Sequence, residues 1–254
     1  MGYPAGRIAL LCPIVSVATF CITFPVAQYV DGTLHYPYYF LSNSIDYPIA
    51  SNIGGLLLSI ASIGYYLTVL VRRQEVRTLL TFELPGGVGG GGRKRCCATR
   101  ALNNAATWCG LTAASGALGV CSFQRHVHRP VHLVFAAMFF LGGAVYLCLQ
   151  LIISRRLGEW EVMAPGVRML RSTSGVLACA AAPFFVFITP LNITFGADED
   201  RVRFVMSVFE AVCLLSQMGF LASFYPQWSH LELHLELRHA AQSQYVTLWP
   251  DRLS

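Results

Sequence analysis

Glu210 is the only acidic residue deep inside one of the long apolar segments of this sequence. An ionisable side chain in hydrocarbon costs at least about 2–3 kcal/mol, so it normally faces the interior of a helix bundle. Such a group can carry a proton, bind a lipid headgroup or take part in catalysis. It can equally be a buried carboxyl that bonds a polar neighbour. The candidate neighbours are Gln217 on the same helix face and, from other segments, Asn103, Tyr146 and Gln150.

Three histidines crowd the short connection between two apolar segments: His126, His128 and His132. A His-x-His pair with a third His four residues later is compatible with zinc binding. Pro130 would break the helical face shared by His128 and His132, and no nearby carboxylate or cysteine completes a tetrahedral site. We therefore expect interfacial histidines, which would become charged near pH 6 in an acidic lumen. No metal ion and no other cofactor is predicted.

The sequence motifs that usually mark enzymes are missing. The chain has no Gly-x-Ser-x-Gly, no His-Glu-x-x-His and no Cys–His pair with an obvious orienting residue. The glycine-rich run 86–92 is not followed by Gly-Lys-Ser/Thr, so it is predicted to be a flexible linker rather than a phosphate-binding loop. We assign no catalytic residue, and the sequence does not indicate an enzyme.

Composition predicts the elements that must position these residues. Of 254 residues, 55% are hydrophobic and only 12% are charged, and the mean hydropathy is +0.53. These values exclude a disordered chain, a coiled coil and an ordinary cytosolic enzyme. The predicted fold is an all-α polytopic membrane protein, because six apolar segments can each cross about 30 Å of hydrocarbon. They lie near residues 8–30, 49–71, 101–121, 131–154, 173–192 and 204–225.

The positions of Lys and Arg predict the orientation, since cytosolic segments carry an excess of both. Most of the 18 basic residues fall in the amino terminus, in 72–100, in 155–172 and in 226–254. Both termini are thus predicted to be cytosolic, with 72–100 a Gly-rich basic loop and 226–254 a tail. Topology also explains the net charge of +5 better than nucleic-acid binding would, because no basic face on a folded surface is indicated.

Small residues spaced four apart predict where helices touch. Ser51, Gly55 and Ser59 form one such stripe, and Ala106, Gly110 and Ala114 form another. Seven of the nine cysteines lie inside apolar segments, so a disulfide framework is not expected.

Three peripheral motifs suggest modification or sorting. Cys96 and Cys97 follow a basic run and are candidates for palmitoylation. Asn192 begins an Asn-x-Thr glycosylation acceptor that lies close to the predicted membrane surface. Tyr245 and Leu248 frame a Tyr-x-x-Leu pattern that resembles an endosomal sorting signal.

A set of short motifs is spread along the chain: Tyr39–Ser42, Asn103, Phe123–Gln124, Val131–His132, Phe135, Gly143, Tyr146, Leu149–Ser154, Phe209–Glu210 and Phe224–Trp228. Together these motifs resemble the DRAM family, the damage-regulated autophagy modulators. The wider superfamily includes the transmembrane 150 proteins and a GPI-anchor lipid-remodelling factor. Family members usually have Asp-(Thr/Ser)-Gly and then Pro–Glu in the first outer loop, where this chain has 43–48, Asn-Ser-Ile-Asp-Tyr-Pro.

The resemblance implies six spans with both ends cytosolic and a non-enzymatic role in autophagy, in lysosomal function or in lipid and phosphoinositide regulation. It implies a lysosomal or endosomal location, with plasma membrane and Golgi as alternatives. Its partners would be membrane lipids and either other membrane proteins or a cytosolic kinase scaffold. We hypothesise that Glu210 faces Asn103, Gln124 and Tyr146 in an intramembrane polar centre that also includes His132 and Gln150.

Two other functional classes remain open. One is an accessory factor or enzyme of GPI-anchor or membrane-lipid remodelling. The other is a small transporter or channel with a water-filled path along Glu210 and the outer histidines. A claudin-like barrier protein would need two cysteines in the first outer loop, and 31–48 has none.

Overall fold

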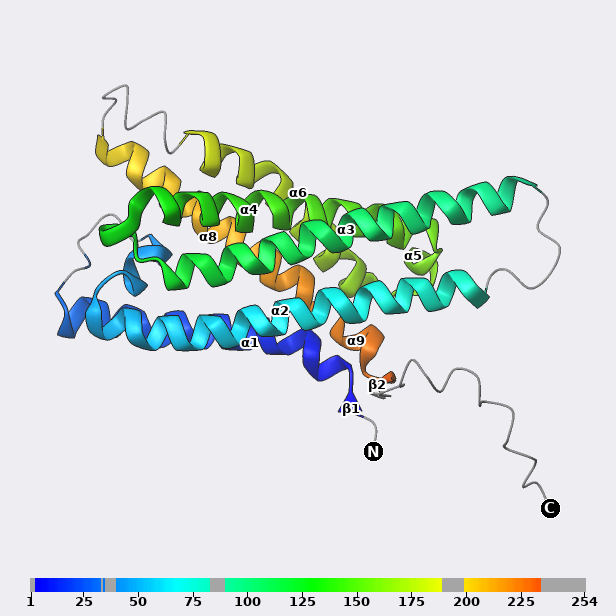
Figure 1. The fold of residues 1–254 in the computed structure, drawn as a ribbon, viewed down its shortest axis with the longest axis horizontal. Coiled ribbons are helices and arrows are strands. Elements are labelled where there is room, and N and C mark those ends of the chain that lie inside the picture. The colour runs from blue at the N-terminus through cyan, green and yellow to red at the C-terminus, as the bar shows by residue number, and fades with distance from the viewer. Residues whose placement is uncertain (1–2, 33, 35–39, 83–89, 189–198, 234–254) are drawn as a thin grey trace, which may run out of the picture.

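The computed structural model describes residues 3–32, 34, 40–82, 90–188 and 199–233. Long helices run side by side in an elongated bundle (Figure 1). The 3-10 helix η2 (Leu41–Ile45), α5 (Glu159–Val162) and α9 (Tyr225–Trp228) are short. The long elements are α1 (Gly6–Pro25) with the π-helix η1 (Val26–Val30), α2 (Pro48–Phe82), α3 (Gly90–Ser122), α4 (Arg125–Arg156), α6 (Pro165–Pro183) with the π-helix η3 (Phe184–Ile188), and α8 (Glu199–Ala222).

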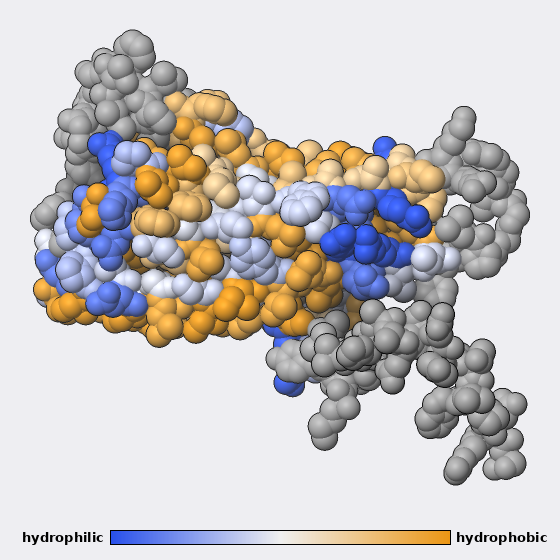
Figure 2. Space-filling view, viewed as in Figure 1, coloured by the Kyte–Doolittle hydropathy of each residue, from blue (hydrophilic) through white to orange (hydrophobic). Residues whose placement is uncertain are grey.

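Among the described residues, five helical stretches are long and apolar enough to cross a membrane: Gly6–Val30, Pro48–Thr81, Arg125–Arg156, Pro165–Phe187 and Phe204–Trp228. Figure 2 shows apolar side chains over the middle of the molecule and hydrophilic ones gathered toward its two ends. The predicted all-α membrane protein is thereby confirmed. The remaining long helix, α3, packs along α2 and α4 but is less apolar, because it carries Asn103, Asn104 and several Thr and Ser residues.

Helices extend well into the region predicted to be the basic loop 72–100. The structure continues α2 to Phe82 and begins α3 at Gly90, so helix occupies about ten residues at each end of this segment. The reason is that the buried helix face does not stop at Arg72. Val76 and Leu80 extend that face by one turn each, and both are buried.

The first and last described segments of the chain contact each other. The two-residue strands β1 (Tyr3–Pro4) and β2 (Glu232–Leu233) pair antiparallel, and the Ala5 N–H donates to the Leu231 carbonyl at 2.9 Å. Trp228, at the end of α9, is fully buried. The start of the predicted tail is therefore packed against the bundle, and the first and last described segments lie together beside it near α9, with α2 and α3 extending beyond them (Figure 1).

Small residues allow close helix approach, as their spacing predicts. A Cβ on Gly116 of α3 would lie only 2.4 Å from the backbone nitrogen of Phe139 on α4. The predicted stripes also face neighbours: Ala106 and Ala114 are fully buried, and the Ser59 hydroxyl lies 3.7 Å from the Cys121 sulfur. All nine cysteines fall within the described ranges, where each is a free thiol.

Candidate functional site

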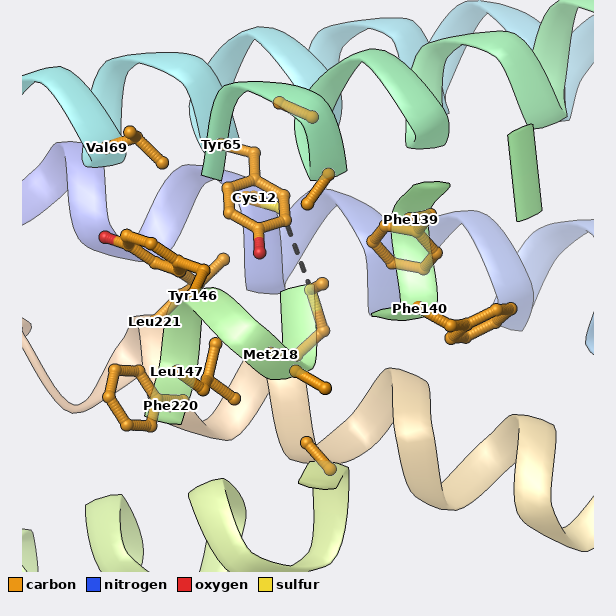
Figure 3. Close-up of a cluster of buried hydrophobic side chains, with 14 of the residues drawn as sticks. Cys12, Tyr65, Val69, Phe139, Phe140, Tyr146, Leu147, Met218, Phe220 and Leu221 are labelled. Carbon is orange, nitrogen blue, oxygen red and sulfur yellow. Dashed lines mark hydrogen bonds between the residues drawn. The ribbon is translucent and has the colours of Figure 1, made fainter. Parts of the chain in front are cut away.

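A cavity of about 90 Å³ lies inside the bundle below η2. Side chains of α1, α2, α3, α4 and α8 line it, together with η2 and one residue of η3. Its deep wall is apolar or weakly polar and includes Cys12, Tyr65, Phe139, Phe140 and Met218, which converge in Figure 3. There the Cys12 thiol donates to the Met218 sulfur at 3.7 Å, so the wall binds α1 to α8.

The end of the cavity nearest η2 is charged. Glu210 of α8 and Arg125, Arg129 and His132 of α4 all contribute to its lining, as does Ser42. A mostly apolar pocket with a few convergent polar groups is the arrangement typical of small-molecule and lipid sites. This cavity is therefore our candidate functional site.

The Glu210 carboxylate is held by backbone amides. It accepts the N–H of Leu41 at 2.6 Å and the N–H of Ser42 at 3.3 Å, while the residue is only 4% exposed. These two amides open η2, and the first N–H groups of a helix have no intrahelical acceptor. The carboxylate thus supplies what the backbone lacks, and η2 covers the cavity because α8 anchors it there.

Further contacts attach η2 to α1 and α4. The Arg125 Nη1 donates to the Asn43 side-chain oxygen at 3.1 Å, and the hydroxyls of Thr23 and Ser44 lie 3.0 Å apart. Asp46 directly follows η2, and its Oδ1 accepts the backbone N–H of His126 at 3.0 Å and lies 3.1 Å from its ring Nδ1. Three helices, α1, α4 and α8, therefore converge on this one short turn.

The three histidines take different roles instead of forming one site. His126 pairs with Asp46 and stacks on Tyr47, and His128 packs edge-on against Phe123. His132 is buried, and its Nδ1 donates to the Phe123 carbonyl at 2.8 Å, because a carbonyl can only accept. The backbone leaves helical geometry at His128 (φ −128°, ψ 52°), two residues before Pro130, which bends the start of α4.

The six residues of the predicted intramembrane polar centre do not form one cluster in the structure. They lie at several places along the bundle. Glu210 and His132 line the cavity. Gln124 donates to the Ser51 hydroxyl at 2.9 Å, and Asn103 donates to the Arg73 carbonyl at 3.0 Å. The Tyr146 ring lies 6.3 Å from that of Tyr65, and its buried hydroxyl has no hydrogen-bond partner among the described residues. Gln150 belongs to a separate cluster at the opposite end of the bundle.

That cluster is a buried ion network, which the sequence pattern did not reveal. Arg72 of α2 binds Glu159 of α5 with two parallel hydrogen bonds of 2.8 and 2.9 Å, a bidentate geometry. It also donates to Glu75 at 2.7 Å, to Gln150 at 3.0 Å and to Ser154 at 3.2 Å. The side chain of Arg72 is completely buried, and its guanidinium is fully surrounded by acceptors.

A second buried arginine completes the network. Arg171 of α6 donates to the hydroxyl and carbonyl of Ser223, both at 3.0 Å, and to Gln227 at 3.1 Å. Its Nη1 lies 3.7 Å from the Glu159 carboxylate. Gln227 and Trp228 in turn donate to Glu75 at 2.7 and 2.8 Å. Two arginines and two glutamates thus balance in charge, and they join α2, α5, α6 and α9.

In the sequence, Arg72 and Arg171 contribute only to the excess of basic residues that predicts the cytosolic side. The signal that could have identified them is acidic residues beside the spans, at Glu75 and Glu159, together with the polar and aromatic run 224–228. Burial alone would raise the pKa of Glu159, but the neighbouring guanidinium groups of Arg72 and Arg171 outweigh it and hold that pKa below its ordinary value.

The peripheral motifs are only partly covered by the described residues. Cys96 is half-buried, with its sulfur 4.0 Å from the Leu80 carbonyl, and Cys97 is exposed. Asn192, Tyr245 and Leu248 lie outside the described residues.

Comparison with known proteins identifies the family to which this bundle belongs. No curated protein and no solved structure is significantly similar to the chain. The family model described as the Frag1/DRAM/Sfk1/Cwh43P N-terminal domain matches residues 5–231. The match runs from the start of α1 to the residue before β2, so it includes every element that lines the cavity or joins the ion network. On this evidence, the chain is a member of the Frag1/DRAM/Sfk1/Cwh43P family of integral membrane proteins.

Proposed function

We propose that this chain is a non-enzymatic modulator of membrane lipids that acts by binding a lipid in the cavity below η2. The observation that carries the proposal is the cavity itself, with an apolar deep wall and a charged end built from Glu210, Arg125, Arg129 and His132. An acyl chain matches the apolar wall, and a polar headgroup matches the charged end. Membership in the family supports a DRAM-like role in autophagy, in lysosomal function or in phosphoinositide regulation.

The proposal includes a topology of six spans with both termini in the cytosol. Two observations support it. First, α3 is 33 residues long and packs along α2 and α4, so it occupies the same depth as two apolar spans despite its lower hydropathy. Second, β1 and β2 pair, which brings the first and last described segments together, as an even number of spans requires. The basic residues favour the cytosol for that side.

A lysosomal or endosomal membrane is the proposed location, with the plasma membrane and Golgi as the alternatives. A cytosolic kinase scaffold or another membrane protein is the proposed protein partner. Imaging the chain tagged after Ser254, with Tyr245→Ala as comparison, tests the location: lysosomal signal that disperses in the variant supports it, and a surface or Golgi signal contradicts it.

The lipid-binding function is tested by filling the cavity. Leu214 lines the cavity, whereas Leu215, the next residue of α8, is 60% exposed on the outside of the bundle. Leu214→Trp should therefore abolish co-purification of lipid from mild detergent, as measured by mass spectrometry, and should fail to restore the lipid profile or autophagic flux of deletion cells. The matched variant Leu215→Trp should behave as wild type. Retention of both properties by a stable Leu214→Trp protein would refute the proposal.

The same preparation separates the other functional classes. Purified protein that converts its bound lipid to a species of different mass would be an enzyme of lipid remodelling. Ion or solute flux through liposomes that Leu214→Trp blocks would instead identify a transporter or channel.

A further inference from the structure

The charged side chains at the end of the cavity nearest η2 determine which lipid headgroup fits there. This inference rests on the lipid-binding function proposed above. Four ionisable side chains line that end: Glu210, Arg125, Arg129 and His132. A headgroup placed there must either complement or oppose their combined charge. Which of the two applies depends on how much of each charge other protein groups already neutralise.

Two described carboxylates close to η2, Glu210 and Asp46, are already engaged by the protein. Glu210 accepts two backbone N–H groups from η2, at 2.6 and 3.3 Å. Asp46 accepts the backbone N–H of His126 and pairs with its ring. The Glu210 carboxylate also interacts electrostatically with Arg125. Neither carboxylate forms an ion pair with Arg129, one turn further along α4.

Arg129 supplies positive charge that these carboxylates do not pair. Its side chain lines the cavity but remains exposed, and among the side chains that the structure describes no carboxylate lies within 4.0 Å of its guanidinium. Arg125 lies one turn earlier, bonded to Asn43 and 5.5 Å from the centre of the Phe40 ring. These contacts hold Arg125 beside η2, next to the place where a headgroup would lie.

We infer that the cavity binds a lipid whose headgroup is an anionic oxygen group, either a carboxylate or a phosphomonoester. The headgroup contacts Arg129 at the charged end of the cavity, and the acyl chain lies against the apolar wall of Phe139, Phe140 and Met218. Guanidinium groups bind both anions with charge-assisted and often bidentate hydrogen bonds. The cover formed by η2 remains in place in this arrangement, because Glu210 and Asp46 keep their present partners.

Three ligands with one chain separate headgroup from tail: oleate, oleoyl lysophosphatidate and 1-monooleoylglycerol. The full-length protein in phosphatidylcholine nanodiscs is titrated with each radiolabelled ligand, and binding to empty nanodiscs is subtracted. We expect the two anions to bind about tenfold more tightly than the neutral monoglyceride, the difference expected of one charge-assisted contact. The tighter of the two anions identifies the headgroup as a carboxylate or a phosphate.

Variants assign the preference to Arg129. Arg129→Gln should reduce the binding of the anions by about five- to tenfold and leave that of the monoglyceride unchanged, whereas Arg129→Lys should keep most of the preference. Arg156→Gln, which removes an exposed arginine from the other end of α4, is the matched control and should bind as wild type.

These measurements separate failure of the anionic-headgroup inference from failure of the proposed lipid binding. Equal affinity for all three ligands, or a preference that survives Arg129→Gln, overturns the inference while lipid binding stands. No binding above empty nanodiscs, with Leu214→Trp indistinguishable from wild type, overturns both.

Discussion

The carboxylate of Glu210, in the last long helix, accepts the backbone N–H of Leu41, in the first connection of the bundle, at 2.6 Å. The two residues are 169 positions apart in sequence. This contact explains how a buried acid is tolerated inside an apolar segment, because the charge is met by the unpaired amides at the start of η2. The same contact holds η2 over the cavity.

Glu210→Gln should destabilise the protein, because a carboxamide has one acceptor oxygen and would direct an N–H₂ donor at one of two amide donors. Leaving a buried donor unpaired costs about 1–3 kcal/mol, which would appear as a lower apparent unfolding temperature in detergent. Glu161→Gln, at an exposed carboxylate of α5, is the matched control. Equal unfolding temperatures for the two variants would show that the contacts with Leu41 and Ser42 contribute little.

Breaking the Arg72–Glu159 pair should cost more. Glu159→Gln leaves two buried guanidinium groups with one fewer negative charge, and removing one member of a buried ion pair typically costs about 3–5 kcal/mol. Combining it with Arg72→Met should cost less than the two single changes together, because the pair is removed as a unit. A double-mutant cycle on unfolding temperature measures the coupling, and strict additivity would contradict a direct pair.

The same pair predicts a pH dependence with a defined sign. Because the pKa of Glu159 is lower in the folded state than in the unfolded state, the folded protein gains stability from its ionised form. That gain is fully present above the unfolded pKa of about 4.3 and is lost as the pH falls through the folded pKa. The advantage of wild type over Glu159→Gln should therefore be large at pH 7 and shrink below about pH 4. A difference independent of pH from 7 to 3 would refute this.

Gly116→Ala should separate α3 from α4, because its Cβ would lie 2.4 Å from the backbone nitrogen of Phe139 and 2.7 Å from the Phe135 carbonyl oxygen. Backbone atoms of a packed helix cannot move aside individually, so we expect a loss of about 1–3 kcal/mol. At Gly166, near the start of α6, an added Cβ meets nothing within 4 Å. Gly166→Ala should therefore be neutral or slightly stabilising, and an equal loss in both variants would contradict the proposed close approach.

The membrane-spanning architecture could be predicted because its signal is local. The composition and length of each apolar segment decide whether a helix can cross hydrocarbon, and the structure contains apolar helices at five of the predicted positions. The small-residue stripe at Ala106, Gly110 and Ala114 was predictable for the same reason, since residues four apart share one helix face. The sequence also indicated that Glu210 is buried, because an ionisable side chain within an apolar span normally faces the interior of the bundle, where polar groups can replace water.

Which groups those side chains meet was decided only by the tertiary structure. Glu210 was expected beside Asn103 and Tyr146, yet it binds backbone amides of η2, which carry no signature in a side-chain pattern. Arg72 was expected in a cytosolic loop, yet it is buried against Glu159, 87 residues later. Such contacts depend on the depth and rotation at which helices pack, and hydropathy constrains neither. Local sequence therefore determined the helices and their environment, whereas the packing of distant helices determined the cavity and its charges.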